Sequence, residues 1–101
     1  MFLGAFVFLD LETTGATAGT DRITEIGLIS VKDGKYESEW QTLINPHRSI
    51  PNNIQLITGI SNQMVENEPT FEEISDSLIK RLEGKILVAH NVRFDYAFLR
   101  N

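Results

Sequence analysis

The sequence predicts an α/β protein built around a mixed β-sheet. Three stretches have the apolar or alternating pattern of strands: residues 5–9, 22–31 and 36–44. The Asp33-Gly34 pair between the last two is the strongest two-residue hairpin signal. Helical spacing over 70–83 and a short apolar run at 85–90 follow. We therefore expect a sheet that opens with antiparallel hairpin strands and continues β-α-β-α.

The strands differ in their expected exposure. Residues 5–9 (AFVFL) are apolar at every position, which indicates a strand buried on both faces. The Gly- and Thr-rich residues 13–21 predict a loop after it. Residues 36–44 have one largely polar face, which indicates a strand near the sheet edge.

Residues 50–66 predict short helices. Pro51 suits a first helical turn, Gly59 can end one helix and Ser61 can cap the next. No repeat or linker interrupts the chain, so we expect these helices to belong to a single domain.

The helix at 70–83 has clearer boundaries. Thr70 and Glu73 form a capping box, and Gly84 stands at the C-terminal stop. After the last strand, Asn91 can cap a final helix that begins near residue 92.

Composition narrows the class of protein. The chain has 101 residues, 42% of them hydrophobic, which is enough for one small domain. It has no cysteine, no apolar run long enough for a membrane span and no recognisable signal peptide, so we expect a cytoplasmic protein without a membrane partner. A broad phosphate-binding surface is usually basic, whereas this chain has a net charge of −5. Binding of a nucleic-acid substrate would therefore need another source of positive charge.

Two acids, Asp10 and Glu12, end the first strand. Alternation along a strand points both side chains to the same face, at the carboxyl end where open α/β sheets place their sites. Like charges this close repel, and a hard cation such as Mg²⁺ or Mn²⁺ relieves the repulsion. The alternative is that the acids cap loop amides or lie in solvent, which a short D-x-E pattern alone would favour.

A second segment, residues 90–99 (HNVRFDYAFL), favours the metal site over the alternative that the acids cap loop amides or lie in solvent. On a helix from Asn91, Asp95 shares the apolar stripe with Phe98 and Leu99, so its carboxylate is expected to face the sheet. An acid there is costly unless it is paired or metal-bound. Three acids would then converge on one cleft; the alternative is an Asp95 at the stripe boundary that reaches water.

These two segments, FLDLETTG and HNVRFDYAFL, together resemble the DnaQ-like (DEDD) 3′–5′ exonucleases, and most closely the epsilon-type proofreading branch of bacterial DNA polymerase III. ITGI at 57–60 also resembles the family's intervening segment. The resemblance covers residues 1–101 as one partial exonuclease domain, and it implies a ribonuclease H-like fold.

The resemblance implies a site with two divalent metal ions, Mg²⁺ or Mn²⁺. Asp10, Glu12 and Asp95 would be the catalytic acids that hold them. The substrate is implied to be the 3′ end of single-stranded or frayed DNA. The residues implied to contact it are Leu11, Thr13, Thr14, Gly15, Thr58, Ile60, Asn91 and Phe94.

The family also uses a fourth acid and a nearby general base, from a later motif that has no counterpart after residue 99. We interpret His47 as a surface residue and His90 as structural. We therefore expect the natural chain to continue past Asn101 and these residues alone to be inactive. A truncated sheet would expose an edge and a helix face, so we also expect that these residues can self-associate. A polymerase subunit or fused domain is the expected protein partner.

Alternatives remain open at this stage. The substrate could be RNA, as in related exonucleases, or the chain could be a non-catalytic binding module with a nuclease fold. A receiver-like phosphoacceptor domain is disfavoured by the opening hairpin. Glu25 is unusual on an apolar strand face; it could partner a helix or Arg22, although exposure at an edge is the simpler interpretation.

Overall fold

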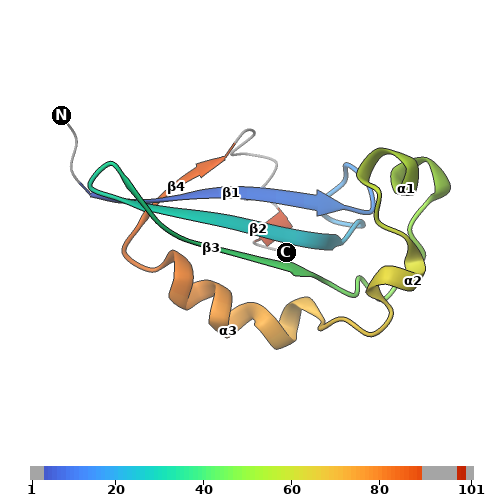
Figure 1. Cartoon of the computed structure of the whole chain (residues 1–101). Coiled ribbons are helices and arrows are strands. Elements are labelled where there is room, and N and C mark those ends of the chain that lie inside the picture. Colours follow the sequence, from blue (N-terminus) through green and yellow to red (C-terminus); the bar gives the residue numbers. More distant parts are fainter. Residues whose placement is uncertain (1–3, 90–97, 100–101) are drawn as a thin grey trace.

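The computed structural model describes residues 4–89 and 98–99, which form a four-stranded mixed sheet with helices below it and at one end (Figure 1). The sheet order is β3-β2-β1-β4, with β1 antiparallel to β2, β2 antiparallel to β3, and β4 parallel to β1. The strands are β1 (Ala5–Thr13), β2 (Ile23–Lys32), β3 (Lys35–Leu43) and β4 (Ile86–Ala89). The predicted α/β class and mixed sheet are confirmed.

The β2–β3 hairpin forms where the sequence predicts it. Asp33 and Gly34 both have positive φ, 53° and 78°, as a two-residue turn matched to the strand twist requires. β3 lies at the sheet edge, as its polar face indicated.

Three helices lie between β3 and β4, a stretch that the structure describes throughout: α1 (Asn52–Thr58), α2 (Asn62–Val65) and α3 (Phe71–Leu82). Gly59 ends α1 with a φ of 77°, and the Ser61 hydroxyl accepts a hydrogen bond from the Met64 amide to cap α2. Pro51 precedes α1 as its N-cap instead of joining the first turn, because its ψ of 146° is extended.

α3 is bounded as its sequence predicts. The Thr70 hydroxyl accepts from the Glu73 amide, and the Glu73 carboxylate accepts from the Thr70 amide. Hydrogen bonding to Thr70 holds the pKa of the Glu73 carboxyl below its ordinary value, and the bond from the Thr70 backbone amide contributes most. Phe98 and Leu99 are helical, but the rest of the helix expected from residue 92 lies outside the described residues.

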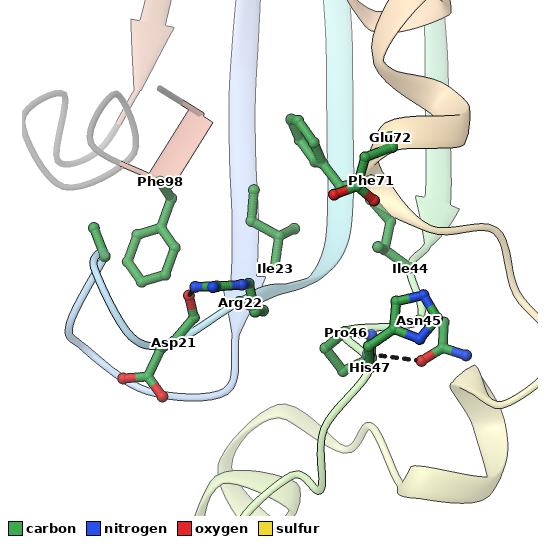
Figure 2. A pocket seen from close by; sticks show the side chains of 11 residues that line it. Asp21, Arg22, Ile23, Ile44, Asn45, Pro46, His47, Phe71, Glu72 and Phe98 are labelled. Carbon is green, nitrogen blue, oxygen red and sulfur yellow. Dashed lines mark hydrogen bonds between the residues drawn. The ribbon is translucent and has the colours of Figure 1, made fainter. Parts of the chain in front are cut away.

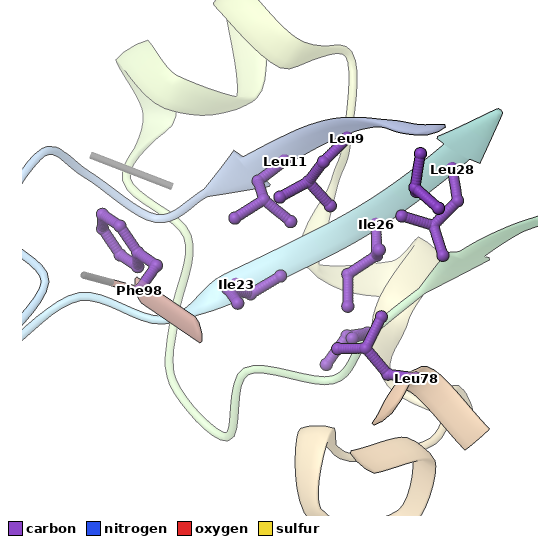
Figure 3. Packing of buried hydrophobic residues seen from close by; sticks show 9 residues of the cluster. Leu9, Leu11, Ile23, Ile26, Leu28, Leu78 and Phe98 are labelled. Atoms are coloured by element: carbon purple, nitrogen blue, oxygen red, sulfur yellow. The ribbon is translucent and has the colours of Figure 1, made fainter. Parts of the chain in front are cut away.

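The main core lies between α3 and one face of the sheet (Figure 3). Alternate residues of β1 enter it, and β2 contributes Ile26 and Leu28 from the neighbouring strand. Leu78 from α3 and Phe98 cover this layer. The core residues of β1 are Val7, Leu9 and Leu11.

The opposite face of the sheet is open in the described part of the chain. Phe8 and Ile29 are neighbours across β1 and β2 and are 45% and 43% exposed. The expectation that β1 is buried on both faces is therefore wrong at Phe8, because the described helices pack on the other face or beyond the strand end (Figure 1). None of the described helices has the length and apolarity to cross a membrane.

We predict that the two faces of β2 respond differently to the same truncation. Ile26→Val should lower the free energy of unfolding by about 0.5–1.5 kcal/mol, because Ile26 is fully buried in the core. Ile29→Val is the matched control on the open face and should have a much smaller effect. Urea denaturation followed by circular dichroism measures both, and equal losses would show that the open face is covered in solution.

Candidate active site

Asp10 and Glu12 lie on the open face of the sheet, near the carboxyl end of β1. The intervening residue, Leu11, enters the core, so the two carboxylates share the face that α3 does not cover. Asp10 lies opposite Gly27 and Glu12 opposite Glu25 on β2. The expectation that the two acids point the same way is confirmed.

Gly27 leaves space beside Asp10. An open hollow of about 360 Å³ lies on the sheet at Gly27 and Asp10, bordered also by Phe8, Ile29 and Glu39. A Cβ on Gly27 would meet only the Asp10 carbonyl, at 3.9 Å. The hollow therefore gives direct access to the strand backbone next to the first acid.

The acids repel one another. Partial burial raises the pKa of Glu12 above its ordinary value, and the nearby charges of Asp10 and then Glu25 raise it further. The Glu25 carboxylate accepts a hydrogen bond from the Gln41 side-chain amide at 2.6 Å. Glu25 is thus paired with neither of the possible partners, a helix or Arg22, since the pairing of β2 with β3 brings Gln41 within reach. Nor does it stand at a sheet edge, because β2 lies between β3 and β1.

The donor set fits a hard divalent cation. Carboxylate oxygens on one open face are the ligands that Mg²⁺ and Mn²⁺ prefer, and a cation would offset the repulsion that raises the pKa of Glu12. Among residues 4–89 and 98–99, no cluster of three or more Asp, Glu, His or Cys side chains is close enough to hold a metal. The third expected ligand, Asp95, lies outside the described residues.

The loop after β1 is held by its own hydrogen bonds. The Thr13 hydroxyl donates to the Gly15 carbonyl at 2.6 Å. Thr14 is 1% exposed, and its hydroxyl bonds within the loop. Leu11 lies in the core cluster. Of the four residues expected to contact substrate here, the structure therefore exposes Thr13 and Gly15 in part and buries Leu11 and Thr14.

The other expected contact residues are farther along the chain. Thr58, at the end of α1, donates to the Ile54 carbonyl and accepts from the Ile60 amide. Ile60 is 4% exposed and packs with Ile50 and Val65 in a second, smaller core. The last two expected contacts, Asn91 and Phe94, lie outside the described residues.

A separate cavity of about 250 Å³ lies on the covered side of the sheet (Figure 2). It lies between the loop before β2, the end of β3 and the start of α3, and Asp21, His47 and Phe98 are among its lining residues. His47 is exposed, as expected, and its amide donates to the Asn45 side chain at 2.9 Å. Asp10 and Glu12 do not line this cavity, because they lie on the opposite face of the sheet.

Asp21 is a residue that sequence reasoning did not single out. Its carboxylate accepts hydrogen bonds from the Thr14 hydroxyl and the Thr17 amide, and it lies against Gly15. The available signal was an Asp near the end of a Gly- and Thr-rich loop, a position where carboxylates commonly bond backbone amides.

Comparison with known proteins agrees with this geometry. Residues 7–101 match the RNase_T family model, described as exonuclease. The chain is 46% identical over 95 residues to a PolC-type DNA polymerase III of Thermotoga petrophila, and 41% identical over 95 residues to the DNA polymerase III epsilon subunit of Treponema pallidum. Both alignments cover 94% of this chain, but only 7% and 44% of those relatives.

A solved structure extends the comparison to three dimensions. Exonuclease X in complex with 5′ overhanging duplex DNA superposes with a TM-score of 0.77 at 32% identity, over 93% of this chain and 53% of that one. The fold and these similarities agree. The chain belongs to the RNase_T exonuclease family, with the features of a DnaQ-like 3′–5′ exonuclease.

Proposed function

We propose that this chain is the N-terminal part of a metal-dependent, proofreading-type 3′–5′ exonuclease domain that hydrolyses phosphodiester bonds at the 3′ end of DNA. The observation that carries the proposal is the pair Asp10 and Glu12. They share an open sheet face at the end of the central strand, and their proximity contributes to the raised pKa of Glu12.

Asp10 and Glu12 would provide oxygen ligands for divalent cations, with Asp95 as the third acid. When bound, two such cations activate a water and stabilise charge on the attacking and leaving oxygens of an in-line displacement. The protein's own contribution is to fix the carboxylates. Leu11 is buried between them, so the strand cannot rotate either acid away from the open face without exposing an apolar side chain.

DNA is the substrate that the relatives favour. Exonuclease X was solved with duplex DNA, and the PolC-type and epsilon relatives are DNA polymerase III proteins. Bound cations would also supply the positive charge that the chain's net charge of −5 lacks. By the same relationships, we propose that the complete protein works as a polymerase subunit or as a domain fused to one.

We predict that divalent metal stabilises the chain through these acids. At about 100 times the dissociation constant, Mn²⁺ should add about 2.7 kcal/mol of stability and raise the Tm by several degrees. Asp10→Ala and Asp95→Ala should each abolish the rise, whereas Asp76→Ala, on the exposed surface of α3, should not. Differential scanning fluorimetry with and without Mn²⁺ measures this, and an equal rise in all four proteins would contradict a shared site.

We predict a pH-dependent effect of Glu12 in metal-free buffer. Its raised pKa means that the ionised form opposes folding at neutral pH, and this penalty disappears below the ordinary value of 4.5. Glu12→Gln should therefore raise the Tm at about pH 7 but not at about pH 3.5. Glu37→Gln, an exposed control on β3, should leave the Tm unchanged at both pH values. A gain of equal size at both pH values for Glu12→Gln would contradict the electrostatic explanation.

We predict little or no exonuclease activity from these 101 residues, because no segment among them matches the family motif that carries the fourth acid and the general base. The measurement is shortening of a 5′-labelled oligonucleotide with Mn²⁺ on a denaturing gel. Stepwise shortening from the 3′ end that disappears in Asp10→Ala would contradict the predicted inactivity and show that the missing groups are supplied in another way.

A further inference from the structure

The carboxylate of Asp21 forms hydrogen bonds with two other residues of the loop 14–22, which connects β1 to β2. Its Oδ1 accepts from the Thr14 hydroxyl at 3.0 Å, and its Oδ2 accepts from the Thr17 amide at 3.1 Å. Arg48, from the segment before α1, lies 4.0 Å from Oδ1 and also donates to the Thr20 carbonyl. One side chain therefore connects the start, middle and end of this loop.

Thr14 extends the ladder between β1 and β2 past the last paired residues, Thr13 and Ile23. Its amide donates to the Arg22 carbonyl at 2.8 Å, and its hydroxyl accepts from the Arg22 amide at 3.0 Å. With the bond to Asp21, the Thr14 hydroxyl both donates and accepts while buried. The loop thus begins from a fixed point two residues after Glu12.

Gly15 is needed for space beside Asp21. Its φ lies outside the left-handed region, so its backbone does not require glycine. A Cβ at this position would, however, lie 2.5 Å from Oδ2 of Asp21, well inside contact distance. Close approach of the Asp21 carboxylate, and not a left-handed backbone, therefore accounts for glycine at this position.

We propose that Asp21 is a positioning residue, which holds Thr13–Gly15 beside Asp10 and Glu12 and thereby sets the affinity for a nucleic-acid 3′ end. This inference rests on the proposed function of the site. Asp21 forms its side-chain hydrogen bonds with Thr14 and Thr17, not with either acid, and acts on the site through Thr14 and Gly15. Figure 2 shows it on the loop at the end of the sheet.

The test is a double-mutant cycle on the full 101-residue chain. The variants are Gly15→Ala, Asp21→Ala and the two combined, with Asp21→Asn as the conservative variant and Asp76→Ala as the surface control. The probe is a 5′-fluorescein single-stranded DNA with a phosphorothioate 3′ linkage, titrated by anisotropy in Mn²⁺. The Mn²⁺-dependent rise in Tm is recorded for each protein.

We expect Asp21→Ala to weaken oligonucleotide binding by about tenfold, as for loss of a hydrogen bond to a charged group, with the Mn²⁺-dependent rise in Tm retained. Asp21→Asn keeps an acceptor for Thr14 and should restore part of the affinity. As a single substitution, Gly15→Ala should weaken binding, because its Cβ would clash with the Asp21 carboxylate. In the Asp21→Ala background it should have little further effect, since that carboxylate is absent.

Unchanged affinity in both single variants would overturn the inference, and so would additive losses in the double variant. Loss of the Mn²⁺ response in Asp21→Ala would also overturn it, because the residue would then act on the metal site or on the fold. Failure of the proposed function is distinct: the unsubstituted chain would bind no oligonucleotide. In that case, amide hydrogen exchange at Thr14 and Arg22 tests whether Asp21 fixes the loop. Faster exchange in Asp21→Ala would support this, and unchanged exchange would refute it.

Discussion

Alternation along the central strand β1 is the constraint on which the site depends. Val7, Leu9 and Leu11 bind the sheet to α3 and Phe98 on one face, and the residues between them are thereby directed to the other. A shift of one residue would bury the acids and expose the leucines. Hydrophobic burial on one face thus determines where two carboxylates stand on the opposite one.

The open face combines two costs. In the part of the chain that the structure describes, apolar side chains such as Phe8 and Ile29 are partly exposed, and Asp10, Glu12 and Glu25 bring like charges together at one end. Proteins retain such features at functional sites, where stability is given up for chemistry. A cation at the acidic end, as proposed above, would reduce the second cost.

Much of this architecture could be predicted from sequence because its signals are local. The Asp33-Gly34 turn, the Thr70–Glu73 capping box and the common face of the two acids depend only on near neighbours in the chain. Exposure of the second face of β1 could not be predicted, since apolarity does not say what covers a strand. The Glu25–Gln41 bond depends on which strands pair, and a linear pattern does not contain that information. The close approach of Asp21 to Gly15 depends on the path of the loop, which a linear pattern does not contain either.

The central claim is that the carboxylates at the end of β1 hold a divalent cation. Paramagnetic broadening of backbone amide signals by substoichiometric Mn²⁺ tests it residue by residue. The account predicts that the signals of Asp10, Glu12 and Gly27 broaden first, that excess Mg²⁺ restores them, and that Asp10→Asn abolishes the effect. Broadening centred instead on the exposed acids of β3, such as Glu37, or unaffected by Asp10→Asn, would contradict the account.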